Sequence, residues 1–191
     1  MRIVAGRHRG LVLEPPADAR IRPTADRVRQ AIFDVLEHRF GVGAASPLRG
    51  AVVLDVFCGS GAMGIEALSR GAARCTFVDS DGGALALAER NARRARETAA
   101  ARFLRRDATQ PGRGSGDATL VFMDPPWGED LAPRALEALR DQGWLAPGAI
   151  ACIETGDRER CDPPAGFELL DERKHGRARV AFMRRVVAPR G

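Results

Sequence analysis

The segment Asp124-Pro125-Pro126-Trp127 combines residue types that could hold the amino group of an aromatic base. It follows the apolar run 119–123, which predicts a buried strand with the Asp124 carboxylate at its C-terminal end. Proline fixes φ, lacks an N–H, and keeps the preceding residue out of the helical region. We therefore predict a rigid bracket that offers one carboxylate, one main-chain carbonyl and one flat ring. An ordinary turn that begins with Asp-Pro is the alternative.

A glycine-rich segment earlier in the chain predicts a nucleoside site. Residues 52–57 form a second apolar run, and Gly59, Gly61 and Gly64 follow it in the spacing G-x-G-x-x-G before a helical pattern. Glycines let the backbone turn tightly and let a ligand approach closely. Asp79 ends the next apolar run and can bind the two hydroxyls of a ribose. A nucleoside-containing ligand is therefore expected across the C-terminal ends of the strands.

Two nucleoside cofactors fit this pattern. A nicotinamide dehydrogenase would use the same glycines, but it needs a proton-transfer group, and His8, His38 and His175 show no suggestive spacing. An S-adenosylmethionine site has an acid before the glycines, where Asp55 stands, and this acid could reach the methionine ammonium group. Asp107 follows a candidate third strand and could accept a hydrogen bond from the adenine amino group. A solvated loop acid is the alternative for Asp107.

With these motifs in place, the chain resembles a known family, the bacterial small-subunit (16S) ribosomal RNA (guanine-N2) methyltransferases. The similar segments are MRIVAGR (1–7), IRPTADRVRQAIF (21–33), LDVFCGSGAMGIEALSRGA (54–72) and DPPW (124–127). The Arg-Pro-Thr element separates this family from other methyltransferases that share the glycine loop. Relatives often have Tyr or Phe in place of Trp127, Ala in place of Cys58 and Glu in place of Asp79. Near His175-Gly176-Arg177, relatives tend to have Lys, Tyr and Gly.

The resemblance implies an α/β fold, a doubly wound Rossmann-like class I methyltransferase sheet with a small N-terminal β-hairpin and helix extension. Residues 1–40 would be this extension, which would lie over the RNA and the cofactor. Residues 41–191 would be the methyltransferase domain. The cofactor would be S-adenosyl-L-methionine. The partner would be ribosomal RNA, within a small-subunit assembly particle, and the methyl acceptor would be a guanine N2 amine.

The expected site residues follow from the motifs together with the resemblance. The catalytic residues would be Asp124, Pro125, Pro126 and Trp127. The cofactor-binding residues would be Arg22, Thr24, Asp55, Phe57, Gly59, Gly61, Asp79, Ser80, Asp107, Ala108 and Asp124. The RNA-binding residues would be Arg2, Arg7, Arg9, Arg22 and Arg27, and no metal ligand is expected.

Charge and composition agree with a nucleic-acid partner. The chain has 191 residues and a net charge of +5, which suits one α/β domain and favours a polyanionic partner. Basic residues gather in 1–30 and 173–190, although such runs are often only solvated faces. No stretch has the ~20 apolar residues of a membrane span, and the N-terminus shows no signal sequence. The four cysteines show no metal or disulfide spacing, so a cytoplasmic location is expected.

Alternating strand and helix patterns predict a parallel doubly wound sheet. The expected strands are 51–57, 75–79, 102–105, 119–123 and 149–154. The expected helices are 25–40, capped by Thr24, then 61–70, 82–97 and 130–142. Hairpins are expected over 2–13 and, by the resemblance, over 167–173 with 179–187.

Other functions stay open on the sequence alone. An amino-methyltransferase acting on DNA adenine or on protein glutamine would use similar motifs, although many such enzymes have Asn in place of Asp124. A non-catalytic RNA-binding assembly factor could keep a relic of the cofactor pocket. The acidic residues Asp55, Asp79, Asp107 and Asp124 are all present, which speaks against such a relic.

Overall fold

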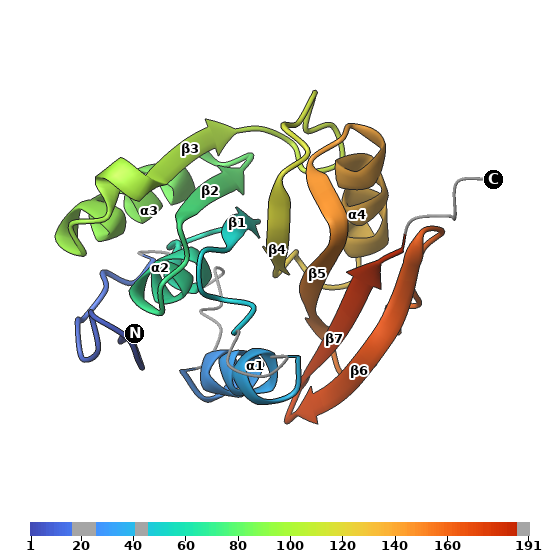
Figure 1. Cartoon of the computed structure of the whole chain (residues 1–191), viewed down its shortest axis with the longest axis horizontal. Helices are drawn as coiled ribbons and strands as arrows, with labels where there is room; N and C mark the ends of the chain where they lie inside the picture. The colour runs from blue at the N-terminus through green and yellow to red at the C-terminus, as the bar shows by residue number, and fades with distance from the viewer. Residues whose placement is uncertain (17–25, 41–45, 187–191) are drawn as a thin grey trace.

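The computed structural model describes residues 1–16, 26–40 and 46–186, so the expected site residues Arg22 and Thr24 lie outside the described part of the chain. Within this part, seven strands form one sheet in the order β3-β2-β1-β4-β5-β7-β6 (Figure 1). The strands are β1 Val52–Val56, β2 Arg74–Asp79, β3 Ala101–Arg105, β4 Ala118–Met123, β5 Leu145–Gly156, β6 Phe167–His175 and β7 Ala178–Arg185. The helices are α1 Asp26–His38, α2 Ala62–Ser69, α3 Gly82–Arg94, the short 3-10 helix η1 Thr98–Ala100, and α4 Leu131–Asp141.

Strands β1 to β5 run parallel, and β7 closes the sheet antiparallel to β5. The chain moves outward from β1 to β3 and then returns to β4 on the other side of β1. This reversal is the switch point at which doubly wound sheets bind their ligands, beyond the C-terminal ends of the strands. The glycine-rich segment follows β1 and the Asp-Pro-Pro-Trp segment follows β4. Both predicted motifs therefore stand at the switch point.

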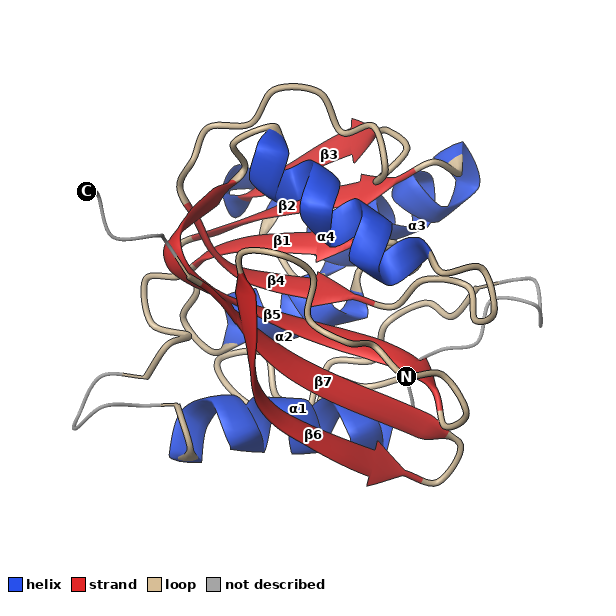
Figure 2. Cartoon of the chain, turned by 90° about the vertical axis from the view of Figure 1, so that its right-hand side faces the viewer, coloured by secondary structure: helices blue, strands red, loops and turns tan. Residues whose placement is uncertain are grey.

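Helices cover both faces of the sheet (Figure 2). One apolar cluster joins α1, α2 and α3 to one face, and it includes Ile3 and Leu13 of the N-terminal segment. A second cluster packs α4 against the other face. The central strands β1 and β4 read as near-continuous apolar runs because they are buried on both faces, whereas the edge strands β3 and β6 are partly exposed. Among the described residues, no helix is long and apolar enough to cross a membrane.

The expected elements are confirmed, with several changed boundaries. Helix α3 ends at Arg94, because Arg96 takes a left-handed conformation (φ 59°) and turns the chain into η1. Strand β5 is longer than expected and includes an irregularity in its pairing with β4. The N-terminal hairpin is confirmed by the bridge of Arg2 with Val12 and by main-chain bonds between its two arms, such as that from the Ile3 N–H to the Leu11 carbonyl at 2.9 Å. The hairpin also bonds to α2.

Candidate active site

Four aspartates that the sequence singled out stand at the C-terminal edge of neighbouring strands. Asp55 lies near the end of β1, Asp79 is the last residue of β2, Asp107 follows β3, and Asp124 follows β4. The carboxyl ends of parallel strands share one edge, so residues spread over 70 positions of sequence meet in space.

Asp79 shapes the glycine loop through hydrogen bonds from two main-chain groups. One carboxylate oxygen accepts a hydrogen bond from the Gly59 N–H at 3.0 Å, and the other accepts from the Asp81 N–H at 3.0 Å. Phe57 turns the chain out of β1 with a φ of 58°, a costly conformation for an aromatic residue that is typical of functional sites. Gly61 has a φ of 75° and begins α2.

Asp55 is buried beneath the same loop, with 3% of its surface exposed. Its carboxyl accepts a hydrogen bond from the Gly64 N–H at 2.8 Å. Burial, followed by the charges of Asp79 and Asp124, raises the pKa of Asp55 to about 8, against the single lowering effect of that hydrogen bond. A buried acid of this kind favours a cationic neighbour, because a positive charge would let it ionise.

Asp107 has the opposite surroundings. Its side chain is exposed, and one oxygen accepts from both the hydroxyl (2.7 Å) and the N–H (2.8 Å) of Thr109. These bonds hold the pKa of Asp107 below its usual value, with the hydroxyl as the larger cause. Two further residues were expected to bind the cofactor. Ala108 is buried, whereas Ser80 is exposed and its main-chain carbonyl accepts a hydrogen bond from Arg105 Nε at 3.1 Å.

The Asp-Pro-Pro-Trp segment lies next to a small cavity at the switch point. Asp124 is half-buried and lines this cavity together with Asp55, Ile32 of α1 and Glu154 of β5. Pro125 is buried, Pro126 is exposed, and the Trp127 ring is half-buried. The structure thus brings the acid after β4 close to the buried acid of β1.

The ring of Trp127 packs against the end of β5 at Gly156. A Cβ atom on Gly156 would stand 3.3 Å from Cε3 and 3.4 Å from Cδ2 of the ring. Sequence reasoning missed both Gly156 and Glu154. The signal for Glu154 is an acid at the end of the apolar run 149–153, the same pattern that identified Asp124.

Of the expected RNA-binding arginines, Arg2, Arg7 and Arg9 lie in the N-terminal segment, residues 1–13, and Arg27 lies on α1, while Arg22 is outside the described residues. Arg2 donates to the Gly10 carbonyl at 2.7 Å, and Arg7 pairs with Glu97 at 2.6 Å while its side chain stays 55% exposed. The segment and α1 enclose a groove of about 370 Å³, which Arg2, Arg9 and Arg27 line.

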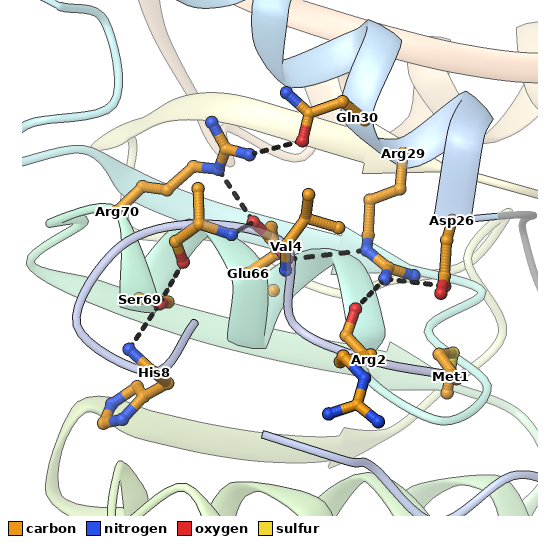
Figure 3. A network of polar contacts seen from close by, with 12 residues as sticks. Met1, Arg2, Val4, His8, Asp26, Arg29, Gln30, Glu66, Ser69 and Arg70 are labelled. Atoms are coloured by element: carbon orange, nitrogen blue, oxygen red, sulfur yellow. Dashed lines mark hydrogen bonds and ion pairs between the residues drawn. The ribbon is translucent and has the colours of Figure 1, made fainter. Parts of the chain in front are cut away.

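A buried polar network fixes this N-terminal segment (Figure 3). Its centre is Glu66 of α2, which sequence reasoning used only as part of a helical pattern. Within the described residues, one further cluster has metal-ligand chemistry, Asp34, Glu37 and His38 on α1. In that cluster Glu37 forms an ion pair with Arg70 at 3.1 Å, and Asp34 accepts a hydrogen bond from Gln30. Both acids therefore have structural partners within the protein.

Comparison with known proteins places the chain among methyltransferases. The family described as "Conserved hypothetical protein 95" matches residues 1–184. Ribosomal RNA small subunit methyltransferase D of Escherichia coli (strain K12) is 33% identical over 194 residues, which is 97% of this chain and 90% of that protein. The protein of the same name from Haemophilus influenzae is 30% identical over 185 residues, covering 92% of this chain and 89% of that protein.

Solved structures agree with this relationship. The Escherichia coli protein yhhF has a TM-score of 0.80 at 32% identity, covering 97% of this chain and 98% of that chain. An RNA methyltransferase from Salinibacter ruber, solved in complex with S-adenosyl-L-homocysteine, shares the fold with a TM-score of 0.65 at 17% identity, over 86% of this chain and 94% of that chain. The matched range, the sheet order and the motifs at the switch point agree, and the chain belongs to the family of the bacterial small-subunit ribosomal RNA methyltransferases.

Proposed function

We propose that the protein transfers a methyl group from S-adenosyl-L-methionine to the exocyclic N2 amine of a guanine in small-subunit ribosomal RNA, in the cytoplasm. The observation that supports this most is the half-buried Asp124, which lines one cavity with the buried acid Asp55 at the switch point. Residues 41–191 would carry the reaction, and residues 1–40 would contact RNA and cover the cofactor.

The residues at the switch point fit the proposed cofactor. Asp79 would bind the ribose hydroxyls, Asp107 would accept from the adenine amino group, and Asp55 would face the methionine ammonium group. When bound, S-adenosylmethionine supplies an electrophilic methyl group on a sulfonium. The lowered pKa of Asp107 keeps it ionised as an acceptor, while the buried Asp55 favours a cation.

Asp124 and the Pro125 carbonyl would each accept one hydrogen bond from the guanine N2 amine. This orients an amine whose lone pair is delocalised into the ring. Methyl transfer to N2 would place positive charge on the nitrogen, with the electron pair of the C–S bond remaining on sulfur, and the N2 proton would then pass to solvent. The Asp124 carboxylate stabilises that charge. Trp127 would stack on the base, which contributes ~1–3 kcal/mol in comparable sites.

Methyl transfer to a mapped base tests the proposal directly. The protein is incubated with labelled S-adenosylmethionine and either purified small-subunit RNA or small subunits, and the labelled base is identified. Label on a guanine N2 is expected. Label on adenine, on DNA or on a protein glutamine would refute the proposal, and no transfer from a well-folded protein would favour an RNA-binding assembly factor.

Changing Asp124 tests its catalytic role. Asp124→Ala should lower the single-turnover rate by about 10²–10³-fold, the usual effect of removing one such electrostatic group, while S-adenosylmethionine still binds. Asp117→Ala is the matched control, because Asp117 precedes β4 at the opposite edge of the sheet and pairs with Arg74. Near-normal turnover by Asp124→Ala would refute the mechanism.

A further inference from the structure

Glu66 is a buried carboxylate with partners from three parts of the chain (Figure 3). Its two oxygens accept hydrogen bonds from the N–H groups of Val4 at 2.8 Å and Ala5 at 2.9 Å. It also pairs with Arg70 Nε of its own helix at 2.9 Å and with Arg29 Nε of α1 at 3.6 Å. Glu66 and Arg29 are both 0% exposed. Charge-assisted hydrogen bonds fix Val4, Ala5 and Arg70 in place, whereas Arg29 Nε forms an ion pair with Glu66 and no hydrogen bond.

The N-terminal segment is bonded to the last turn of α2 at further points. Ser69 Oγ accepts from the His8 N–H at 3.0 Å and donates to the Ala5 carbonyl at 2.6 Å. The Ser69 carbonyl accepts from the Arg7 N–H at 2.9 Å. At Gly6 the two backbones lie so close that a Cβ atom would stand 2.0 Å from the Ser69 oxygen. These bonds and this close contact hold the N-terminal segment rigidly against α2.

Helix α1 is fixed by the same carboxylate through Arg29. The Arg29 guanidinium also bonds to Asp26 at 2.9 Å and to the carbonyl of Arg2. Ile32, three positions further along α1 and so on the same face as Arg29, lines the cavity of the candidate active site. Glu66 thus connects the N-terminal segment and α1 to the helix that begins at the glycine loop.

The groove between the N-terminal segment and α1 has the chemistry of a phosphodiester site. Arg2, Arg9 and Arg27 line it, together with Asp26 and Gln30. Guanidinium groups bind phosphates through paired hydrogen bonds, and three of them outweigh one carboxylate. The two walls of this groove are the parts of the chain that Glu66 holds.

We propose that Glu66 is a positioning residue for RNA. It fixes the N-terminal segment and α1 against the cofactor helix, so that the groove binds backbone phosphates of RNA at a set distance from the methyl donor. Glu66 contacts neither RNA nor cofactor in this arrangement. The inference rests on the proposed function, since it takes RNA as the substrate.

The test compares RNA binding and cofactor binding in Glu66→Gln. The dissociation constant for small-subunit RNA should rise by about tenfold or more, and the plot of log K against log salt should become shallower by about one unit for each lost phosphate contact. The dissociation constant for S-adenosylmethionine should change by less than about threefold, because Asp55, Asp79 and the glycine loop remain. Unchanged RNA affinity and salt slope in folded Glu66→Gln would overturn the proposal.

Glu66→Gln also removes the counter-charge of two buried arginines, which destabilises a fold, so milder variants are needed. Ser69→Ala and Glu97→Gln loosen only the N-terminal segment, since Glu97 pairs with Arg7 and with His8 Nε2 at 2.5 Å. Both should raise the RNA dissociation constant and leave cofactor affinity unchanged.

Glu89→Gln is the matched control, because Glu89 is an exposed acid of α3 that pairs with Arg93. It should bind RNA as the wild type does. A purely structural network predicts lower melting temperatures with unchanged RNA affinity of the folded fraction, and that result would overturn the proposal. Failure of the wild type to bind RNA would instead refute the proposed function, whereas normal RNA binding by every variant would refute only the role of Glu66.

Discussion

At the scale of single residues, the acids along the C-terminal edge of the sheet differ because their surroundings differ. Burial keeps the Asp55 carboxyl protonated near neutral pH until a cation arrives, whereas the Thr109 hydrogen bonds keep exposed Asp107 ionised. Asp55, under the glycine loop, can therefore respond to a nearby cation by ionising. Asp107, after β3, stays ionised and can accept hydrogen bonds. This division matches a ligand that carries an ammonium group at one end and an adenine at the other.

The raised pKa of Asp55 predicts a pH-dependent stability. In the folded protein the carboxyl ionises near pH 8, and in the unfolded chain near its usual 3.8, so the folded state holds an extra proton between these values. The contribution of Asp55 to the free energy of unfolding is fully present below about pH 4. It is lost as the pH rises toward 8, by at most ~1.4 kcal/mol per pH unit. Asp55→Asn should remove this slope from the free energy of unfolding, measured with urea across the pH range.

Asp117→Asn serves as the control for Asp55→Asn. Hydrogen bonding by Ser115, as the largest cause, lowers the pKa of Asp117, so its contribution is present above its usual pKa and is lost as the pH falls through the lowered value. The two variants should change the pH profile in different ranges. Identical slopes for Asp55→Asn and the wild type between pH 4 and 8 would contradict the buried, protonated state of Asp55.

The packing of Trp127 against Gly156 predicts a coupling between these residues. Gly156 has no left-handed φ and lies in β5, where glycine ordinarily weakens a strand, so the space beside the ring explains it. Gly156→Val should displace the ring and raise KM for RNA by several-fold, within the ~1–3 kcal/mol that base stacking contributes. Steady-state kinetics at saturating S-adenosylmethionine would measure this.

A double-mutant cycle separates this packing effect from general damage to β5. If Gly156→Val acts through the indole, it should have much less effect in a Trp127→Phe background, where the smaller ring leaves room. Additive effects of the two substitutions on KM would show that the residues act independently. The melting temperatures of all three variants provide the check on folding.

At the scale of elements, α2 is buried along its whole length because four other parts of the chain surround it. The sheet and α3 cover one side, while the N-terminal segment and α1 cover the other. The polar residues on that outer side, Glu66 and Ser69, are satisfied by main-chain groups of the segment. A short helix at the cofactor loop is thus held rigidly on every side.

Gly64 sets how closely α2 approaches β2. A Cβ atom on Gly64 would stand 2.4 Å from Cε1 of Phe77 and 2.5 Å from Sγ of Cys75. Gly64→Ala should therefore overpack the interface and lower the free energy of unfolding by ~1–3 kcal/mol, as measured by urea unfolding. The third glycine of such a loop has this packing role in nucleotide-binding folds.

Gly82→Ala, in the first turn of α3, is the control for this prediction. There the added methyl group would meet only the Arg105 side chain, at 3.6 Å, and alanine favours the helix. We expect Gly82→Ala to be neutral or slightly stabilising. Equal stability of both variants would mean that α2 can shift on the sheet.

At the scale of the whole molecule, the cofactor site joins loops from four strands and should couple ligand binding to global stability. A ligand at 100 times its dissociation constant stabilises the folded state by ~2.7 kcal/mol, which is roughly 5–10 °C for a chain of this size. S-adenosylmethionine should raise the melting temperature by this amount. NAD should give no comparable shift, and a larger shift with NAD would favour the nicotinamide alternative.

Asp79→Ala is the matched variant for the thermal-shift experiment. The substitution removes the expected ribose acceptor and the hydrogen bonds that hold Gly59 and Asp81. Hydrogen bonds to charged groups contribute ~1.5–3 kcal/mol, so the affinity for S-adenosylmethionine should fall by about tenfold or more. A full thermal shift in Asp79→Ala would remove this residue from the site.

Local patterns in the amino-acid sequence were enough to predict several features of this protein. Apolar runs predicted the strands of the parallel sheet, because strands buried on both faces carry few polar residues. The glycine spacing and the acids after each run predicted the switch-point site, because parallel strands end at one edge. The Asp-Pro-Pro-Trp segment was recognisable because its chemistry lies in four consecutive residues.

Which distant residues share one environment became visible only in the folded chain. Val4 and Glu66 are 62 positions apart, and no local pattern links a main-chain N–H to a carboxylate on a later helix. The N-terminal hairpin was predicted from its own residues, but its bonds to α2 were not, because they depend on a buried charge in a distant part of the chain. The pKa of Asp55 and the space at Gly156 were likewise invisible, since burial and close approach arise only when the whole chain packs.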